Sequence, residues 1–226
     1  MFNKNIVAIG GGGFGRSLGD LYIEKYIVSL CDKQRPKVCF IPTASGDNDL
    51  YKLNFYRAFS KLNCFTTHVD FFSRTIDLEK HILNQDIIYV GGGNTKSMLA
   101  VWRDWNLDVV LQKAYNSGII MSGVSAGAIC WFEKGITDSY SESLEIINCL
   151  GFLKGIACPH FDEEEEREPY VNKLLIEAKI KSCICMEGYS ALHVRGENEF
   201  KSVNFGTNNK SYELFYENNK ILKKLF

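Results

Sequence analysis

Short apolar runs alternate with longer amphipathic stretches along the first two thirds of the chain. The runs are rich in β-branched residues and end at Gly or Pro, which is typical of buried strands. They lie at residues 6–9, 38–41, 87–90 and 119–121, with a weaker run at 65–69. Amphipathic stretches at residues 18–30, 50–62, 78–83 and 107–116 indicate helices between them. This alternation predicts a parallel sheet with helices on both faces.

After residue 180 the pattern changes to short strand-like segments separated by turn residues. They lie at residues 184–186, 191–194 and 212–216 and indicate antiparallel strands that finish the same domain. A chain of 226 residues, 46% of them hydrophobic, is long enough to bury one full core. The expected fold is therefore a single α/β domain over residues 1–226. Its doubly wound, mostly parallel sheet has helices on both faces and C-terminal antiparallel strands.

Charge and cysteine content narrow the class of protein. The net charge is −1 with both signs scattered, so no surface for nucleic acid or for an anionic membrane is expected. No secretory segment or membrane-length apolar run is found, which favours a cytoplasmic location. The eight cysteines include no C-x-x-C pair and no zinc-like cluster, so they are expected to be reduced thiols. Neither a metal nor an organic cofactor is expected, and both a monomer and a homodimer stay open.

The pentapeptide Gly-Val-Ser-Ala-Gly at residues 123–127 directly follows a predicted strand. Small residues on both sides of Ser125 allow a sharp turn from strand to helix, which lifts one hydroxyl above the end of the sheet. The backbone N–H of Ala126 would then point toward the oxyanion of a tetrahedral intermediate. A plain strand-to-helix turn is the other interpretation of the same pattern. Ser125 is the candidate nucleophile.

Two glycine-rich segments also follow predicted strands. Residues 91–95, Gly-Gly-Gly-Asn-Thr, leave backbone N–H groups free to face a cleft, and one of these amides would supply a second oxyanion donor. Asn94-Thr95 is expected to cap the helix that follows. Residues 10–15 match G-x-G-x-x-G, a dinucleotide-binding signature. The second strand ends at Pro42-Thr43 instead of an acidic residue for the ribose, which favours a simple glycine turn. A noncatalytic dinucleotide-binding module, with Ser125 only a turn residue, is kept as an alternative.

A serine nucleophile needs a base, and the chain has four histidines. His68, His81 and His193 lie in predicted strands or a predicted helix, where a structural imidazole is expected. His160 follows a short apolar run that ends at Pro159. A histidine just past a strand end can reach a serine on a neighbouring strand, take its proton and return it to the leaving group. His160 is therefore the candidate base.

A carboxylate would complete this site, because it fixes the imidazole tautomer and stabilises the imidazolium. Asp138 follows the expected nucleophile helix and a glycine turn, whereas Asp162 lies two residues after His160. Alternate strand positions share a face, so Asp162 would point beside the imidazole instead of toward its ring. Both aspartates stay open on this reasoning. Glutamates 163–166 are expected to form a solvated acidic loop or a helix start.

Four segments together resemble one family. Residues 91–95, 122–128, 138–139 and 159–161 are similar, in order and spacing, to peptidase E and its relatives in serine peptidase family S51. The similarity covers roughly residues 4–195. The resemblance implies a fold like that of class I glutamine amidotransferases, with serine in place of their cysteine nucleophile.

The resemblance also implies roles for individual residues. It makes Ser125 the nucleophile, His160 the base and Asp138 the orienting acid, with an oxyanion hole from Gly92 or Gly93 and from Ala126. Amidotransferases place the acid two residues after the histidine, at Asp162 here. Peptidase E places it after the nucleophile, so the nearer relative favours Asp138.

Peptidase E removes N-terminal aspartate from dipeptides, and its relative cyanophycinase cleaves β-aspartyl-arginine links. The expected function is therefore a Ser-His-Asp hydrolase of a small peptide or isopeptide bond, with N-terminal aspartyl dipeptides as candidate substrates. The chain departs from the family in two ways. None of Arg16, Arg57, Arg103, Arg167 and Arg195 matches the aspartate-recognising arginine, and residues 128–133 are bulky. An amidase or esterase acting on a non-peptide acyl compound is the alternative enzyme.

Overall fold

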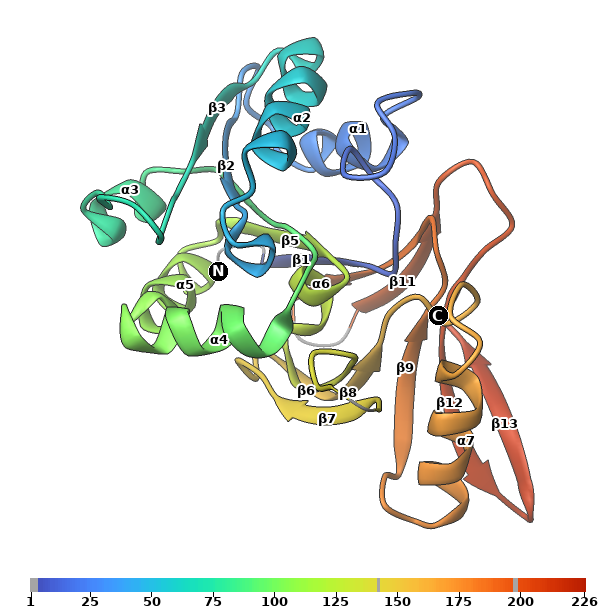
Figure 1. Cartoon of the computed structure of the whole chain (residues 1–226). Coiled ribbons are helices and arrows are strands. Elements are labelled where there is room, and N and C mark those ends of the chain that lie inside the picture. Colours follow the sequence, from blue (N-terminus) through green and yellow to red (C-terminus); the bar gives the residue numbers. More distant parts are fainter. Residues whose placement is uncertain (1–3, 142, 197–198) are drawn as a thin grey trace.

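The computed structural model describes residues 4–141, 143–196 and 199–226, which form two β-sheets with helices packed around them (Figure 1). The first sheet has seven strands in the order β11-β10-β1-β5-β4-β2-β3. They are β1 (Asn5–Ile9), β2 (Lys37–Ile41), β3 (Phe65–His68), β4 (Ile87–Val90), β5 (Ile120–Val124), β10 (Ser190–Arg195) and β11 (Glu199–Asn204). Strands β1 to β5 are parallel, and β10 and β11 add to them antiparallel. The predicted α/β class is confirmed, and so are the parallel strands and the antiparallel strands from the C-terminal part of the chain.

The helices alternate with these strands. They are α1 (Tyr22–Ser29), α2 (Asp49–Phe59), α3 (Leu78–Leu83), α4 (Thr95–Asp104), α5 (Leu107–Asn116), α6 (Ala126–Ile129) and α7 (Arg167–Ile176), with short 3₁₀ turns at Thr43–Ser45 and Ser60–Leu62. The side chain of Asn94 caps α4 by accepting a hydrogen bond from the N–H of Ser97, at 2.8 Å. This confirms the cap predicted after the triple glycine.

The central strands β1, β2, β4 and β5 of the first sheet are buried on both faces, which explains why they are mostly apolar runs. On one face, Val7, Ile9 and Phe40 pack with Ile27 of α1 and Phe55 of α2. On the other face, alternate residues of the same strands pack with α3, α4, α5 and the second sheet. The doubly wound arrangement predicted from the sequence is therefore present.

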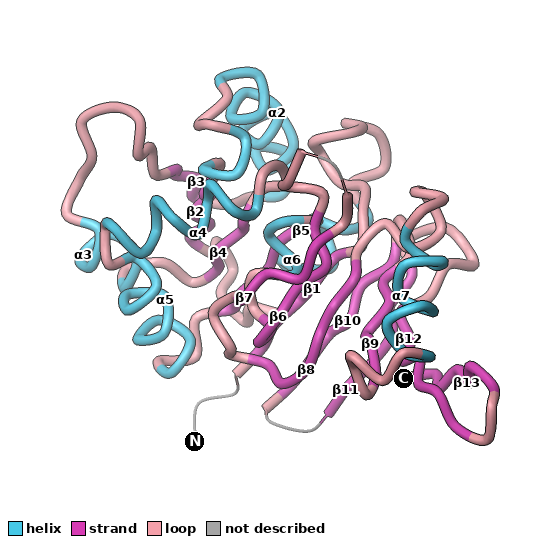
Figure 2. The backbone as a smooth tube through the Cα atoms, turned by 60° about the horizontal axis from the view of Figure 1, so that its bottom comes forward, coloured by secondary structure: helices cyan, strands magenta, loops and turns pink. Residues whose placement is uncertain are grey.

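The second sheet has six strands in the order β13-β12-β9-β8-β6-β7. They are β6 (Phe132–Thr137), β7 (Glu145–Asn148), β8 (Leu153–Cys158), β9 (Ser182–Met186), β12 (Ser211–Glu217) and β13 (Lys220–Leu225). Strands β6, β8 and β9 are parallel to one another. Trp131, Phe132 and Ile184 join the core cluster of the first sheet, so the two sheets pack together, as Figure 2 shows from a second direction.

This second sheet corrects the expectation of one sheet. The segments at 184–186 and 212–216 are strands as predicted, but they lie in the second sheet and not in the first. The expected helix after Ser125 is only one turn, because Trp131 and Phe132 are fully buried between the sheets and β6 starts at once. Strands that the sequence analysis placed in one sheet therefore lie in two different sheets.

Within the described ranges, no helix is both long and apolar enough to cross a membrane. The same residues include no group of three or more His, Cys, Asp or Glu side chains placed to hold a metal ion. All eight cysteines are free thiols.

Candidate active site

Ser125 lies at the turn between β5 and α6, with backbone angles of φ 58° and ψ −115°. A Cβ atom on Gly123 would overlap the carbonyl oxygen of Gly127, and one on Gly127 would overlap that of Val90 in β4. Both flanking glycines are therefore needed because backbone packs against backbone here. The sharp strand-to-helix turn expected from the pentapeptide is confirmed.

The backbone of Ser125 lies in a region that favours glycine, at a cost of about 1–3 kcal/mol for other residues. Alanine keeps the Cβ atom and therefore the backbone strain. Glycine removes the strain, but it also raises the conformational entropy of the unfolded chain, which offsets part of the gain in stability. We expect Ser125→Gly to be more stable than Ser125→Ala by about 1 kcal/mol in urea unfolding, with both inactive. Equal stability of the two variants would show that the turn stores no strain.

His160 follows β8 of the second sheet, and its backbone N–H donates to the carbonyl oxygen of Gly10 after β1, at 3.1 Å. The residue is 7% exposed. Ser125 and His160 together line two hollows. The first, of about 240 Å³, also includes Arg16, Tyr51 and Gly92. The second, of about 260 Å³, also includes Asp138 and Glu164. The structure thus brings together the predicted nucleophile and base from different sheets.

The residues of the predicted oxyanion hole lie close to Ser125: Gly92 and Gly93 each line one of the two hollows with it, and Ala126 follows it in the chain. A Cβ atom on Gly92 would lie 3.2 Å from the Cβ of Ser125, and the Gly92 N–H donates to the hydroxyl of Tyr51 at 3.3 Å. Gly93 has φ 137°, which a side chain rarely allows. Ala126 is the first residue of α6, so its N–H has no acceptor within the helix. Tyr51, whose pKa burial raises to about 12, is a site residue that no sequence signal indicated.

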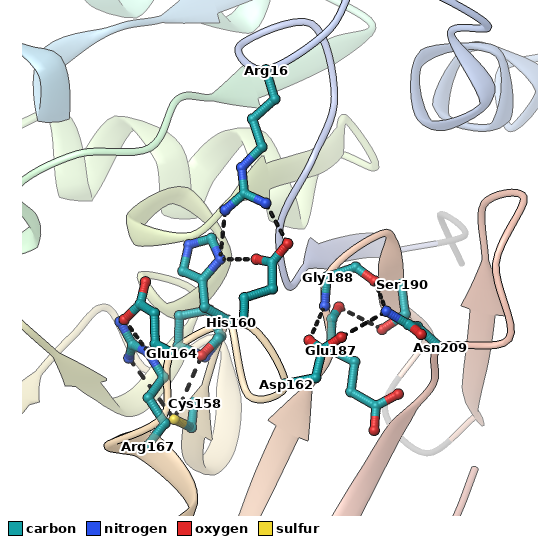
Figure 3. A network of polar contacts seen from close by, with 12 residues as sticks. Arg16, Cys158, His160, Asp162, Glu164, Arg167, Glu187, Gly188, Ser190 and Asn209 are labelled. Carbon is teal, nitrogen blue, oxygen red and sulfur yellow. Dashed lines mark hydrogen bonds and ion pairs between the residues drawn. The ribbon is translucent and has the colours of Figure 1, made fainter.

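The carboxylate that contacts His160 is neither of the two aspartates considered from the sequence. Asp138 is exposed and lines the second hollow. Asp162 points away from the imidazole, as expected: it accepts from the N–H of Gly188 in the loop after β9, at 2.6 Å, and from Nδ2 of Asn209 in the loop before β12, at 2.7 Å (Figure 3). Nδ1 of His160 instead lies 2.6 Å from Oε2 of Glu163. Residues 163–166 form the turn before α7, as expected, but the Glu163 carboxylate contacts the imidazole and is not free in solvent.

Arg16 extends this group from the loop after β1. Its guanidinium forms an ion pair with Oε1 of Glu163, and its Nη2 lies 3.2 Å from Nδ1 of His160 (Figure 3). The other arginines considered from the sequence have different surroundings. Arg167 is buried and paired with Glu164, Arg103 donates to the carbonyl oxygen of Asn148, and Arg195 pairs with Glu199.

The glycine-rich loop at residues 10–15 lacks the geometry of a dinucleotide site. Helix α1 starts only at Tyr22, so no helix N-terminus follows Gly15 to hold a pyrophosphate. The loop instead contacts the candidate active site, since Gly12, Gly15 and Arg16 line the first hollow.

The remaining histidines have structural partners. His68 lies 2.6 Å from the hydroxyl of Tyr56, and His193 lies 2.7 Å from that of Tyr26. Burial lowers the pKa of His193 to about 4, so this imidazole is neutral. His81 contacts the hydroxyl of Thr67 at 3.1 Å. These environments agree with the structural roles expected from the sequence.

Cys130, the cysteine closest in sequence to Ser125, is fully buried. Its thiol donates to the carbonyl oxygen of Gly127 at 3.3 Å, and burial raises its pKa well above the ordinary value. A buried, protonated thiol is a poor nucleophile. Cys130 therefore supports the turn and does not compete with Ser125.

Comparison with known proteins decides the family. The model of peptidase family S51 matches residues 6–201. The chain belongs to peptidase family S51. An uncharacterised peptidase of Bacillus subtilis, YgaJ, is 39% identical to this S51 chain over 219 residues, which cover 96% of the chain and 95% of YgaJ. Peptidase E of Pasteurella multocida is 27% identical over 184 residues, covering 74% of the chain and 75% of that enzyme. The S51 chain is therefore a peptidase.

Solved structures agree on the fold. A peptidase from an acI-B1 actinobacterium matches with a TM-score of 0.69 at 16% identity, covering 98% of the S51 chain and 97% of that structure. A structure titled as a putative peptidase E of Listeria monocytogenes matches with a TM-score of 0.67 at 19% identity, covering 89% of the S51 chain and 98% of that structure.

Proposed function

We propose that this S51 peptidase hydrolyses a small peptide or isopeptide bond with Ser125 as nucleophile and His160 as base. The observation that supports this most is that a strained strand-to-helix turn presents Ser125 to the two hollows that His160 also lines. Both sheets contribute to the site, so we treat residues 1–226 as one catalytic domain. Eight free cysteines fit a cytoplasmic enzyme, since a reducing compartment keeps thiols unpaired.

In this mechanism His160 accepts the hydroxyl proton as Ser125 Oγ attacks the carbonyl carbon. The N–H groups of Ala126 and of Gly92 or Gly93 stabilise the oxyanion. The imidazolium then protonates the leaving amine, and water hydrolyses the acyl-enzyme by the reverse sequence of proton transfers. Asp138, in the second hollow, is the orienting acid that the family resemblance proposes, and Glu163 is a second candidate for this role.

The hollows favour a small substrate. Each of them, at about 240 and 260 Å³, is below the usual 300–1,000 Å³ of a drug-sized site. Arg16 at the first hollow pairs with Glu163, and Glu164 at the second pairs with Arg167, whereas the exposed Asp138 places a negative charge at the second hollow. The similarity to peptidase E supports N-terminal aspartyl dipeptides as candidate substrates.

The test is a dipeptide and isopeptide library with a varied N-terminal residue, incubated with enzyme and read by mass spectrometry. We expect a subset of dipeptides to be consumed by the wild type and none by a Ser125→Ala preparation purified in parallel. Turnover confined to simple esters or amides would favour the alternative acyl hydrolase. Equal turnover by both preparations would refute the proposal.

A further inference from the structure

We propose that Tyr51 is a further catalytic residue, whose phenolic O–H donates a hydrogen bond to the oxyanion of the tetrahedral intermediate. This inference rests on the proposed function, because the oxyanion forms only when Ser125 attacks a carbonyl carbon. Tyr51 keeps its proton throughout and acts by stabilising negative charge. Its side chain comes from the first turn of α2 and lines the hollow that Ser125, Gly92 and His160 also line.

The hydroxyl of Tyr51 accepts one hydrogen bond and has its own proton left to donate. The backbone N–H of Gly92 donates to it at 3.3 Å, and no other hydrogen bond of this hydroxyl is found among the residues that the structure describes. A phenol oxygen can accept and donate at once, so the O–H is available to a substrate. Burial raises the pKa of Tyr51 to about 12, which keeps the proton on the oxygen at neutral pH.

The contact with Gly92 places this donor close to the nucleophile. A Cβ atom on Gly92 would lie 3.2 Å from Cβ and 3.8 Å from Oγ of Ser125. The Gly92 nitrogen and the Tyr51 oxygen are 3.3 Å apart, so one substrate oxygen can accept from both at ordinary hydrogen-bond lengths of about 2.7–3.0 Å. The Tyr51 O–H therefore joins the N–H groups of Gly92 and Ala126 as a third oxyanion donor.

The surroundings of Tyr51 fix its ring before a substrate binds. Its backbone N–H donates to Oδ1 of Asn48, the N-cap of α2, at 3.0 Å. Its ring packs against those of Phe14 and Phe40, with centroid distances of 5.3 and 5.0 Å. A donor that is already in position needs little reorganisation when negative charge develops, which is the condition for strong electrostatic stabilisation.

Two glycines from separate loops make room for this ring. A Cβ atom on Gly15 would lie 2.8 Å from Cε2 of Tyr51, and one on Gly91 would lie 2.9 Å from Cε1. Neither glycine has a positive φ, so neither is required by its own backbone conformation. The last glycine of residues 10–15 and the first of residues 91–95 therefore fit the position of the tyrosine.

Tyr51→Phe is the decisive variant, because phenylalanine keeps the ring packing and removes only the hydroxyl. We expect kcat on the dipeptide that the library identifies to fall by about 10²–10³, the usual loss for one oxyanion donor, with KM nearly unchanged. A hydroxyl that only occupies the N–H of Gly92 would give the opposite result, since its removal would free that N–H for the oxyanion. An unchanged or raised kcat would therefore overturn the inference.

Tyr56→Phe is the matched control on the same helix. The hydroxyl of Tyr56 lies 2.6 Å from Nδ1 of His68, and neither residue lines the two hollows that contain Ser125. Its kcat should be unchanged. A loss of kcat in Tyr56→Phe as large as that in Tyr51→Phe would assign the effect to the packing of α2 and would contradict the inference.

The contact can also be observed directly in a crystal structure of the wild type with the amino aldehyde that corresponds to the N-terminal residue of that dipeptide. Ser125 Oγ bonds to the aldehyde carbon, the π electron pair of the carbonyl moves to its oxygen, and the serine proton passes to His160. We expect this oxygen at about 2.7 Å from the Tyr51 hydroxyl. A separation beyond about 3.5 Å would overturn the inference.

The two proposals fail in different ways. An inactive Ser125→Ala beside a fully active Tyr51→Phe would refute the role of Tyr51 and leave the proposed function standing. An active Ser125→Ala would refute the proposed function itself.

Discussion

Ser125→Ala is expected to lower kcat by on the order of 10⁶ and to leave the melting temperature within a few degrees of the wild type. The hydroxyl is the attacking group in the proposed mechanism, whereas its removal creates little cavity at a partly exposed turn. Ser122→Ala is the matched control. Its hydroxyl donates to the carbonyl oxygen of Ile88 inside the sheet at 2.8 Å, so its loss should affect stability and not turnover.

His160→Ala should reduce kcat about as much as Ser125→Ala, because a nucleophile and its base act as a unit. The double variant should then be no slower than either single variant. Steady-state kinetics of the three proteins on the dipeptide that the library identifies measure this directly. A double variant that is slower by the product of the two effects would show that the residues act independently.

Glu164→Ala is expected to cost about 3 kcal/mol of unfolding free energy, because it leaves a buried guanidinium without its carboxylate. The side chain of Arg167 is 2% exposed and pairs with Glu164 at 2.6 Å. Without this partner, its Nη1 retains the carbonyl oxygen of Ile136 at 3.3 Å and the sulfur of Cys158 at 3.9 Å. Urea denaturation of the folded variant measures the loss.

Arg167→Met should cost less than half as much, since it removes the buried charge and leaves Glu164, 31% exposed, accessible to water. Glu165→Ala, at the exposed neighbouring glutamate, is the control and should stay within about 0.5 kcal/mol of the wild type. Equal losses of unfolding free energy in Glu164→Ala and Arg167→Met would indicate that the unpaired buried charge of Arg167 is not the cause of the destabilisation.

The site depends on the packing of two sheets. Ser125 follows β5 of the first sheet, and His160 follows β8 of the second. The backbone hydrogen bond from His160 to Gly10 links the loop after β8 to the loop after β1. Substitutions that weaken the packing between the two sheets should therefore lower kcat even when each sheet keeps its own strand pairing.

Local patterns were sufficient for much of the first sheet. The central parallel strands β1, β2, β4 and β5 are buried on both faces, so their burial appears in the sequence as apolar runs closed by a turn residue, whereas the edge strand β3 is partly exposed and gave a weaker signal. The turn at Ser125 was also predictable from the local sequence. Its small neighbours are required by contacts within the turn and with the adjacent strand β4.

The second sheet and the surroundings of His160 were decided only by tertiary structure. Strands β6, β8 and β9 pair across long separations in the sequence, and no local signal specifies such partners. Glu163 is one of four consecutive glutamates, which look alike in the sequence. The fold distinguishes it from the other three, because Gly11, Gly188 and Arg16 come from distant loops to enclose its carboxylate. Composition and periodicity therefore determined which elements form, whereas the contacts between distant loops determined which carboxylate meets the histidine.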